Sequence, residues 1–257
     1  MINELKRALL GEGAAQIGLW SALSSPIAAD IVAGSGFDWL LLDTEHAPNE
    51  LLTIHRQLQA MQGSSTAAVV RPAWNDPVIF KRLLDIGVQN LVVPFVQNAD
   101  EARRAVAATR YPPEGVRGVA TTTRASRYGR VKDYLKRANN EICIIVQVET
   151  RVALQNLESI AAVDGVDGLF IGPSDLAADM GHLGDNAHAD VRAAIDAAIA
   201  RIQETGKVAG ILATVEADAR HWLEVGCRFV AVGSDVGLLA RQSEALAARF
   251  KPHAALK

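Results

Sequence analysis

The stretch GVDGLFIGPSDLAADMG (residues 165–181) contains one complete structural unit of this chain. Its apolar run, GLFIG at 168–172, is continuous rather than alternating, which is typical of a parallel strand covered on both faces. SDLAAD at 174–179 follows at once and is predicted to begin a short helix. The stretch therefore predicts a buried strand that leads directly into a helix.

The same unit recurs along the whole chain, with helix-like segments and glycine-containing turns between the apolar runs. The other seven runs are IGLWSAL (17–23), WLLLD (39–43), AAVVR (67–71), LVVPF (91–95), ICIIVQVE (142–149), VAGILAT (208–214) and FVAVG (229–233). Eight strands alternating with helices predict an α/β fold, a single (β/α)8 TIM barrel over residues 1–257. A doubly wound open sheet is the alternative.

Residues 111–140 interrupt this rhythm. They are polar and basic, contain two prolines and carry no clear apolar run. Loops of this length in compact domains are usually functional or disordered. We therefore expect residues 111–140 to be either a functional loop or a disordered one.

Composition excludes several classes of protein. There are 26 Lys+Arg against 29 Asp+Glu, a net charge of -3, whereas nucleic-acid binding normally needs a basic face. No apolar run approaches the ~20 residues of a membrane span, and MINELKRALLGEG (1–13) lacks the pattern of a signal peptide. Cys143 and Cys227 are too few for a disulfide framework and are predicted to be buried. We expect a cytoplasmic protein without nucleic-acid or membrane partners.

Polar residues follow the apolar runs at the C-terminal ends of the predicted strands, where the active site of such a barrel lies. They are Asp43, Glu45 and His46 after the second run, Arg71 in the third, Gln147 and Glu149 in the fifth, Ser174 and Asp175 after Gly172 and Pro173, and Ser234 and Asp235 after the eighth. Five strand ends that together carry carboxylates, a histidine and an arginine predict one converging polar site.

Glu149 and Asp175 end neighbouring predicted strands, so their carboxylates can meet over the barrel mouth. Two like charges this close repel unless a cation lies between them. Two carboxylates completed by water and substrate oxygens favour an octahedral site for Mg2+, Mn2+ or Co2+. The alternative, equally compatible with the spacing, is that each carboxylate pairs with an arginine such as Arg71 or Arg151, or caps a helix.

Three further residues fit the binding and activation of a carboxylate substrate. Arg71 can hold an oxyanion by charge-assisted hydrogen bonds, with a surface salt bridge as the alternative. Ser174 lies where free backbone N–H groups can bind a carboxylate, and it can also be a plain helix cap. Asp43, three residues before His46, can reach one nitrogen of the His46 ring and leave the other as a base. A structural histidine is the alternative.

Missing motifs narrow the chemistry. The sequence has no GxGxxG, no GxxxxGK[ST] and no GxSxG pattern, which argues against dinucleotide, P-loop and serine-hydrolase sites. No lysine ends a predicted strand, so a Schiff-base aldolase would lack its nucleophile.

Five stretches of the chain resemble the HpcH/HpaI aldolase family. They are GFDWLLLDTEHAPNE (36–50), VVRPAWNDP (69–77), VPFVQNADEARRAVAATRYPPEGVRG (93–118), VQVETR (146–151) and GVDGLFIGPSDLAADMG (165–181). The combination is far more specific than any one piece, and the resemblance extends over almost the whole chain. It implies a barrel of the phosphoenolpyruvate/pyruvate type and a class II, divalent-metal-dependent pyruvate aldolase.

The resemblance also implies roles for individual residues. Glu149 and Asp175 would bind the metal, His46 supported by Asp43 would be the general base, and Arg71 would hold pyruvate and its enolate. The other residues implied around the substrate are Gln147, Gly172, Pro173, Ser174 and Asp175 for pyruvate, and Trp20 and Leu212 for the aldehyde.

The implied reaction is the reversible cleavage of 4-hydroxy-2-oxo acids, such as 4-hydroxy-2-oxoheptanedioate, to pyruvate and an aldehyde such as succinate semialdehyde. A 2-dehydro-3-deoxyglucarate-type aldolase, another 2-oxo acid lyase and a non-catalytic carboxylate-binding barrel are the alternatives. Thr44 and the segment 120–129 depart from the family pattern, which bears on the choice of aldehyde.

An assembly is implied as well. Family members are typically hexamers that exchange a C-terminal helix, here LLARQSEALAARF (238–250), and Asp85 matches a residue that reaches the site of a neighbouring subunit.

Overall fold

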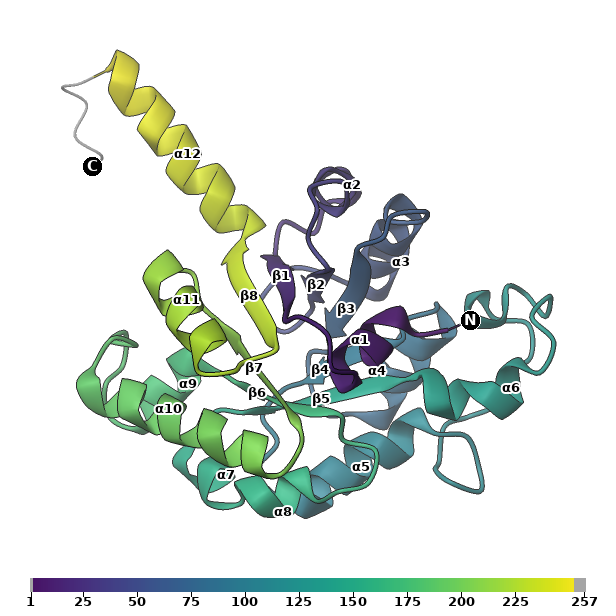
Figure 1. Cartoon of the computed structure of the whole chain (residues 1–257). Helices are drawn as coiled ribbons and strands as arrows, with labels where there is room; N and C mark the ends of the chain where they lie inside the picture. The colour runs from purple at the N-terminus through teal and green to yellow at the C-terminus, as the bar shows by residue number, and fades with distance from the viewer. Residues whose placement is uncertain (1, 252–257) are drawn as a thin grey trace.

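The computed structural model describes residues 2–251, which form a closed barrel of eight parallel strands surrounded by helices (Figure 1). The strands pair in chain order, and β8 closes on β1. They are β1 Gln16–Ser21, β2 Trp39–Asp43, β3 Ala67–Arg71, β4 Asn90–Val93, β5 Cys143–Val148, β6 Gly168–Ile171, β7 Val208–Leu212 and β8 Phe229–Ser234. All eight predicted strands are present, and the closed order excludes the open doubly wound sheet.

Helices follow the strands and cover the outside of the barrel (Figure 1). They are α1 Glu4–Leu10, α2 Pro26–Ala33, α3 Leu51–Ala60, α4 Pro77–Asp85, α5 Ala99–Thr109, α6 Tyr134–Arg137, α7 Arg151–Gln155, α8 Leu157–Ala161, α9 Pro173–Asp179, α10 Ala189–Glu204, α11 Glu216–Glu224 and α12 Asp235–Phe250, with 3-10 turns η1 Arg124–Ser126 and η2 Ala138–Glu141. No helix within residues 2–251 has the length and apolar character to cross a membrane.

Alternate residues along each strand build two separate cores. One set faces outward to the helices, and Leu40 and Leu42 of β2 belong to it. The other set fills the barrel interior, where Trp39 and Phe229 stack with their ring centroids 3.9 Å apart. Leu5 and Leu9 of α1 join this inner core, so α1 closes the N-terminal end of the barrel. The opposite end is left for the polar side chains.

Gly18 in β1 makes room for the inner core. A Cβ atom at this position would lie only 2.1 Å from the Trp39 ring. Trp39 is fully buried, and its indole N–H donates to the backbone oxygen of Gln16 at 3.0 Å. A glycine inside a strand therefore allows close contact with a large aromatic neighbour.

The segment 111–140 is ordered and forms a small core of its own. Tyr111, Tyr134 and Ala138 are buried together, and η1, α6 and η2 lie within or at the end of the segment. Arg124 donates to the backbone oxygens of Ile86 and Leu58, beyond α4 and within α3. The segment therefore packs near the C-terminal ends of those helices, which is the end of the barrel opposite to the active-site end. Of the two expectations for this segment, a functional loop or a disordered one, disorder is excluded.

α12 projects away from the barrel (Figure 1). Asp235 is its only buried residue within the described part of the chain. Leu239 and Phe250 are 58 % and 80 % exposed. These apolar side chains of α12 are therefore left uncovered by the single chain.

Candidate active site

A cavity of about 160 Å3 opens at the C-terminal ends of the strands. Its lining contains nine of the residues predicted from the sequence, together with Phe170. These are Trp20, His46, Arg71, Gln147, Gly172, Pro173, Ser174, Asp175 and Leu212. Asp43 and Glu149 lie directly behind this lining, in contact with Arg71 and Gln147.

Arg71 ends β3 and is held rigidly at the cavity wall. Its Nε and Nη2 donate to the two carboxylate oxygens of Asp43 at 2.8 and 2.6 Å, and its Nη1 lies 2.9 Å from Oε2 of Glu45. The guanidinium also lies over the ring of Trp20, 4.8 Å from the ring centroid. Its side chain is 7 % exposed, so the surface salt bridge considered above is excluded.

Asp43 positions Arg71 and not the His46 ring. The Trp20 indole N–H donates to Asp43 Oδ2 at 3.2 Å, and the backbone N–H of Glu45 donates to Oδ1 at 3.0 Å. Within residues 2–251, Asp43 contacts His46 only through the His46 backbone N–H, at 3.5 Å. The expected bond to the His46 ring is thus wrong, because the guanidinium and the indole take both carboxylate oxygens. Burial raises the pKa of Asp43, but the bonds and charge of Arg71 outweigh it and leave this pKa below its ordinary value.

Glu45 contacts two of the predicted site residues, although the sequence analysis gave it no individual role. It lies between Arg71 and His46, with its Oε2 3.9 Å from His46 Nε2. Burial raises the pKa of Glu45 above its ordinary value, and the positive charge of Arg71 only partly offsets this rise. Its position directly before His46 was the only sequence signal for it.

Glu149 follows β5 and is buried behind the cavity. Its Oε1 accepts from the backbone N–H of Phe95 at 2.8 Å, and its Oε2 accepts from Nε2 of Gln147. Phe95 holds a left-handed backbone conformation with φ of 55°, which no sequence pattern indicated. Burial, followed by the negative charge of Asp175, raises the pKa of Glu149 to about 7.

Gly172 explains how Glu149 comes so close to β6. A Cβ atom at position 172 would lie 2.3 Å from Oε2 of Glu149 and 2.8 Å from Nε2 of Gln147. Gly172 is also the N-cap residue of α9, and Pro173 is the first residue of the helix. Ser174 is therefore not the helix cap, and its hydroxyl accepts from Nδ2 of Asn186 at 3.0 Å.

Neither Glu149 nor Asp175 is neutralised by an arginine among the described residues. Arg71 is engaged by Asp43 and Glu45, and Arg151 pairs with Asp179 at 3.1 Å. The ion-pair alternative considered above is therefore wrong for these two carboxylates.

The donor set fits a divalent cation. A buried carboxylate with a strongly raised pKa and a second carboxylate nearby carry excess negative charge that a cation would offset. Oε1 of Gln147 is buried in the cavity wall and has no hydrogen-bond partner in the described structure. Oxygen atoms of this kind suit a hard ion such as Mg2+ or Mn2+.

Three other predicted residues lie outside the cavity. Ser234 caps α12, and its hydroxyl accepts from the backbone N–H of Gly237 at 3.1 Å. Asp235 is buried and accepts from Oγ of Ser21 and the backbone N–H of Ala22, which ties β8 to β1. Asp85 ends α4, on the opposite side of the barrel, and bonds the buried Arg117 at 3.1 Å. Asp85 therefore cannot reach the cavity of its own chain.

A (β/α)8 barrel with a rigid arginine, a histidine and paired carboxylates around one cavity at its C-terminal end is built as an enzyme. The sequence profile of the HpcH/HpaI aldolase/citrate lyase family matches residues 16–242. The chain therefore belongs to the HpcH/HpaI family of aldolases and lyases.

Individual members of this family are similar to the chain in sequence and in structure. The chain is 57 % identical to a 4-hydroxy-2-oxo-heptane-1,7-dioate aldolase of Escherichia coli, over 97 % of this chain and 95 % of the relative. A crystal structure of an HpcH/HpaI family protein from Burkholderia cenocepacia superposes with a TM-score of 0.93 at 40 % identity, covering 97 % of this chain and 99 % of the other. An HpcH/HpaI aldolase from Desulfitobacterium hafniense superposes with a TM-score of 0.87 at 28 % identity, covering 98 % and 97 %.

Proposed function

We propose that this enzyme cleaves 4-hydroxy-2-oxoheptanedioate, and related 4-hydroxy-2-oxo acids, reversibly to pyruvate and an aldehyde. For the seven-carbon diacid the aldehyde is succinate semialdehyde. The observation that carries the proposal is the single cavity in which Arg71, His46, Gln147 and Asp175 meet. The substrate named for the 57 % identical relative supports the choice of substrate.

Glu149 and Asp175 would hold a divalent metal ion, with Gln147 beside it. When bound, the ion supplies Lewis-acid polarisation of the ketone and charge to balance the carboxylates. The pair of carboxylate ligands is compatible with Mg2+, Mn2+ and Co2+.

Arg71 binds and orients the 2-oxo acid. Asp43 and Glu45 engage three of the five N–H donors that a guanidinium carries. Two donors are left for substrate oxygens, in a group that the two carboxylates and the Trp20 ring prevent from turning. Arg71 thereby stabilises the negative charge that develops on the pyruvate enolate when the C3–C4 bond breaks.

His46 is the general base of the proposal. Its side chain is 65 % exposed and lines the cavity, so its ring is accessible to a substrate hydroxyl. In cleavage it takes the proton of the 4-hydroxyl group as the C3–C4 bond breaks, and protonation of the enolate at C3 then gives pyruvate. In synthesis a methyl proton of pyruvate is removed first, the enolate attacks the aldehyde, and the ring returns its proton to the new alkoxide. Glu45 lies beside it, with its Oε2 3.9 Å from Nε2 of the ring.

The remaining lining shapes the two halves of the substrate. Gly172, Pro173 and Ser174 border the cavity on the α9 side, next to Asp175, where pyruvate binds in the proposal. Trp20 of β1 and Leu212 of β7 also line the cavity, and in the proposal they form the aldehyde side.

We also propose the assembly and the compartment. The exposed apolar face of α12 suits exchange with a neighbouring subunit of a homo-hexamer, in which Asp85 reaches the site of an adjacent chain. An aldolase that acts on small diffusible acids would work in the cytoplasm.

The substrate choice is tested by comparing turnover of 4-hydroxy-2-oxoheptanedioate with that of 2-dehydro-3-deoxyglucarate, both followed by pyruvate release. We expect the linear diacid to have the higher kcat/KM. A higher kcat/KM for the sugar acid would place the enzyme with the other aldolases considered above. Binding of pyruvate without release from either substrate would indicate a non-catalytic barrel.

A further inference from the structure

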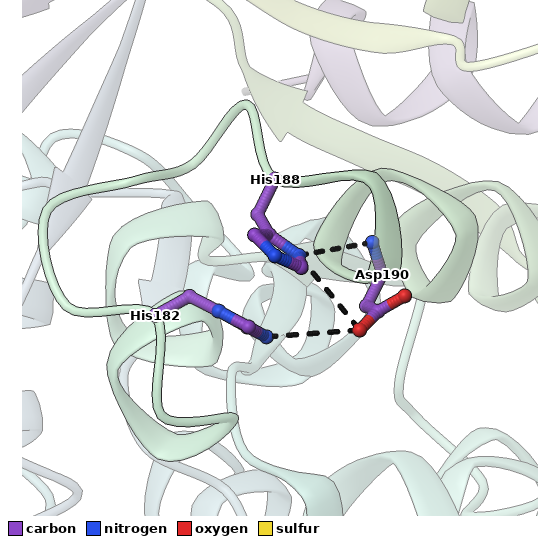
Figure 2. A group of neighbouring side chains, drawn as sticks. All are labelled: His182, His188 and Asp190. Carbon is purple, nitrogen blue, oxygen red and sulfur yellow. Dashed lines mark hydrogen bonds and ion pairs between the residues drawn. The ribbon is translucent and has the colours of Figure 1, made fainter.

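A second cluster of side chains that could hold a metal ion lies outside the active site, on the segment that joins α9 to α10 and in the first turn of α10. It consists of His182, His188 and Asp190 (Figure 2). One ligand atom from each residue lies within 4.8 Å of the others. Neither the proposed reaction nor the relatives described above give this cluster a role.

The two imidazole rings are stacked, with centroids 3.5 Å apart and an angle of 17° between their planes. Nε2 of His182 and Nδ1 of His188 each lie 3.8 Å from the same oxygen, Oδ2 of Asp190. Figure 2 shows both rings turning a nitrogen toward that carboxylate. Two nitrogens therefore converge on one oxygen at a separation too long for a direct hydrogen bond.

One hydrogen bond of the His188 ring indicates the state of its Nδ1. This nitrogen accepts from the backbone N–H of Asp190 at 3.2 Å, at the start of α10. An accepting Nδ1 carries no proton, so it presents a lone pair and not a donor near the carboxylate. A cation between Nδ1 of His188 and Oδ2 of Asp190 would stabilise these two acceptors. Binding it would break the 3.2 Å hydrogen bond from the backbone N–H of Asp190.

The ligand types select the ion. Two imidazole nitrogens, one carboxylate oxygen and an open side toward solvent match the tetrahedral preference of Zn2+. Mg2+ prefers an octahedral set of oxygens and is poorly served by imidazole. The nitrogen–oxygen distances of 3.8 Å exceed by about half an ångström the spacing that Zn–ligand bonds of about 2.0 to 2.1 Å require in a tetrahedron. This adjustment is small because the Asp190 side chain is 72 % exposed and free to move.

We propose that His182, His188 and Asp190 form a Zn2+ site, separate from the carboxylate site in the barrel. The same segment carries Asn186, which donates to Ser174 in the lining of the active cavity. A bound ion would therefore hold the segment 182–190 in place beside α9. The proposal does not depend on the aldol reaction, since it concerns side chains outside the cavity.

Zinc binding is measured by calorimetry on the full chain in the Glu149→Gln, Asp175→Asn background, which lacks the barrel carboxylates. We expect one Zn2+ per chain at micromolar concentration. Adding His182→Gln should weaken binding by at least about tenfold, since removal of even an outer-shell partner costs about 10- to 100-fold. His221→Gln is the matched control, because His221 pairs with Asp196 at 2.9 Å but has no second imidazole. It should bind Zn2+ as the background does.

Absence of zinc binding in the background, or equal binding by the His182→Gln and His221→Gln variants, would overturn the proposal. A second measurement covers a background that does not fold. In the wild-type enzyme saturated with Mg2+, added Zn2+ should shift the ring nitrogen NMR signals of His182 and His188 and leave those of His221 unchanged. Unchanged signals for His182 and His188 would equally overturn it.

Discussion

Glu149 is a residue whose ionised form the fold disfavours. Burial and the charge of Asp175 raise its pKa to about 7 from an ordinary value of 4.5. Between these two values the folded protein keeps the proton that the unfolded chain has lost, so the free energy of unfolding falls as pH rises. Below about pH 4.5 both states are protonated and the penalty vanishes.

The penalty can be measured in EDTA, without a bound ion. Between pH 4.5 and 8 the wild type should lose about 3 kcal/mol of unfolding free energy relative to Glu149→Gln, at about 1.4 kcal/mol per pKa unit. Urea unfolding of both proteins across this range gives the difference. If the free energies of unfolding of the two proteins change in parallel with pH, the pKa of Glu149 is not raised in the folded state.

Substitution of Arg71 tests how much the fixed position of its guanidinium contributes to catalysis. Arg71→Lys keeps the charge but cannot reproduce the planar contacts with Asp43 and Glu45. We expect kcat/KM to fall by about 10²- to 10³-fold, the range for losing one preorganised donor to a developing oxyanion. Arg201→Lys is the control, because Arg201 makes a bidentate pair with Glu158 on the surface. A loss of similar size in both variants would contradict the role of Arg71.

Residue types at strand ends were predictable from the sequence, but their partners were not. The apolar runs place Arg71, Gln147 and Asp175 at one end of the barrel, and all three line the cavity. Asp43 was expected to contact the His46 ring from its spacing of three residues, yet Arg71, 28 positions away, takes its carboxylate. Contacts between strands depend on the barrel register, which local spacing does not contain.

At the scale of elements, the junction of β6 and α9 controls the position of Glu149. Gly172→Ala would place a Cβ atom 2.3 Å from Oε2 of Glu149. We expect this variant to bind Mn2+ at least about tenfold more weakly, because the carboxylate must move away from its proposed ligand position. Gly13→Ala is the control, since a Cβ atom at that position meets nothing within 4 Å. Calorimetric Mn2+ titrations that agree between the two variants would contradict this geometry.

Element positions followed closely from hydrophobic patterning. Each predicted run differs from the observed strand by at most two residues at either end, as WLLLD and β2 show by coinciding at 39–43. The segment 111–140 was harder, because its order rests on long-range contacts such as Arg117 with Asp85 and Tyr134. A polar segment stabilised by distant partners has no periodic signal of its own.

At the scale of the whole molecule, α12 extends an apolar face that the single chain does not cover (Figure 1). Leu239→Glu should break the proposed hexamer into smaller species, because it buries a charge in the proposed subunit contact. Light scattering measures the mass directly. Leu183→Glu is the control, since Leu183 is 85 % exposed on the segment between α9 and α10. A wild-type mass near that of one chain would contradict the assembly itself.

The most direct test of metal-dependent aldol cleavage is pyruvate release from 4-hydroxy-2-oxoheptanedioate before and after treatment with EDTA. We expect activity to disappear with chelation and to return when Mg2+ or Mn2+ is restored, because the proposed ligands Glu149 and Asp175 then regain their ion. Activity that is indifferent to EDTA, with the metal removed completely, would contradict the assignment of the two carboxylates and the reaction built on them.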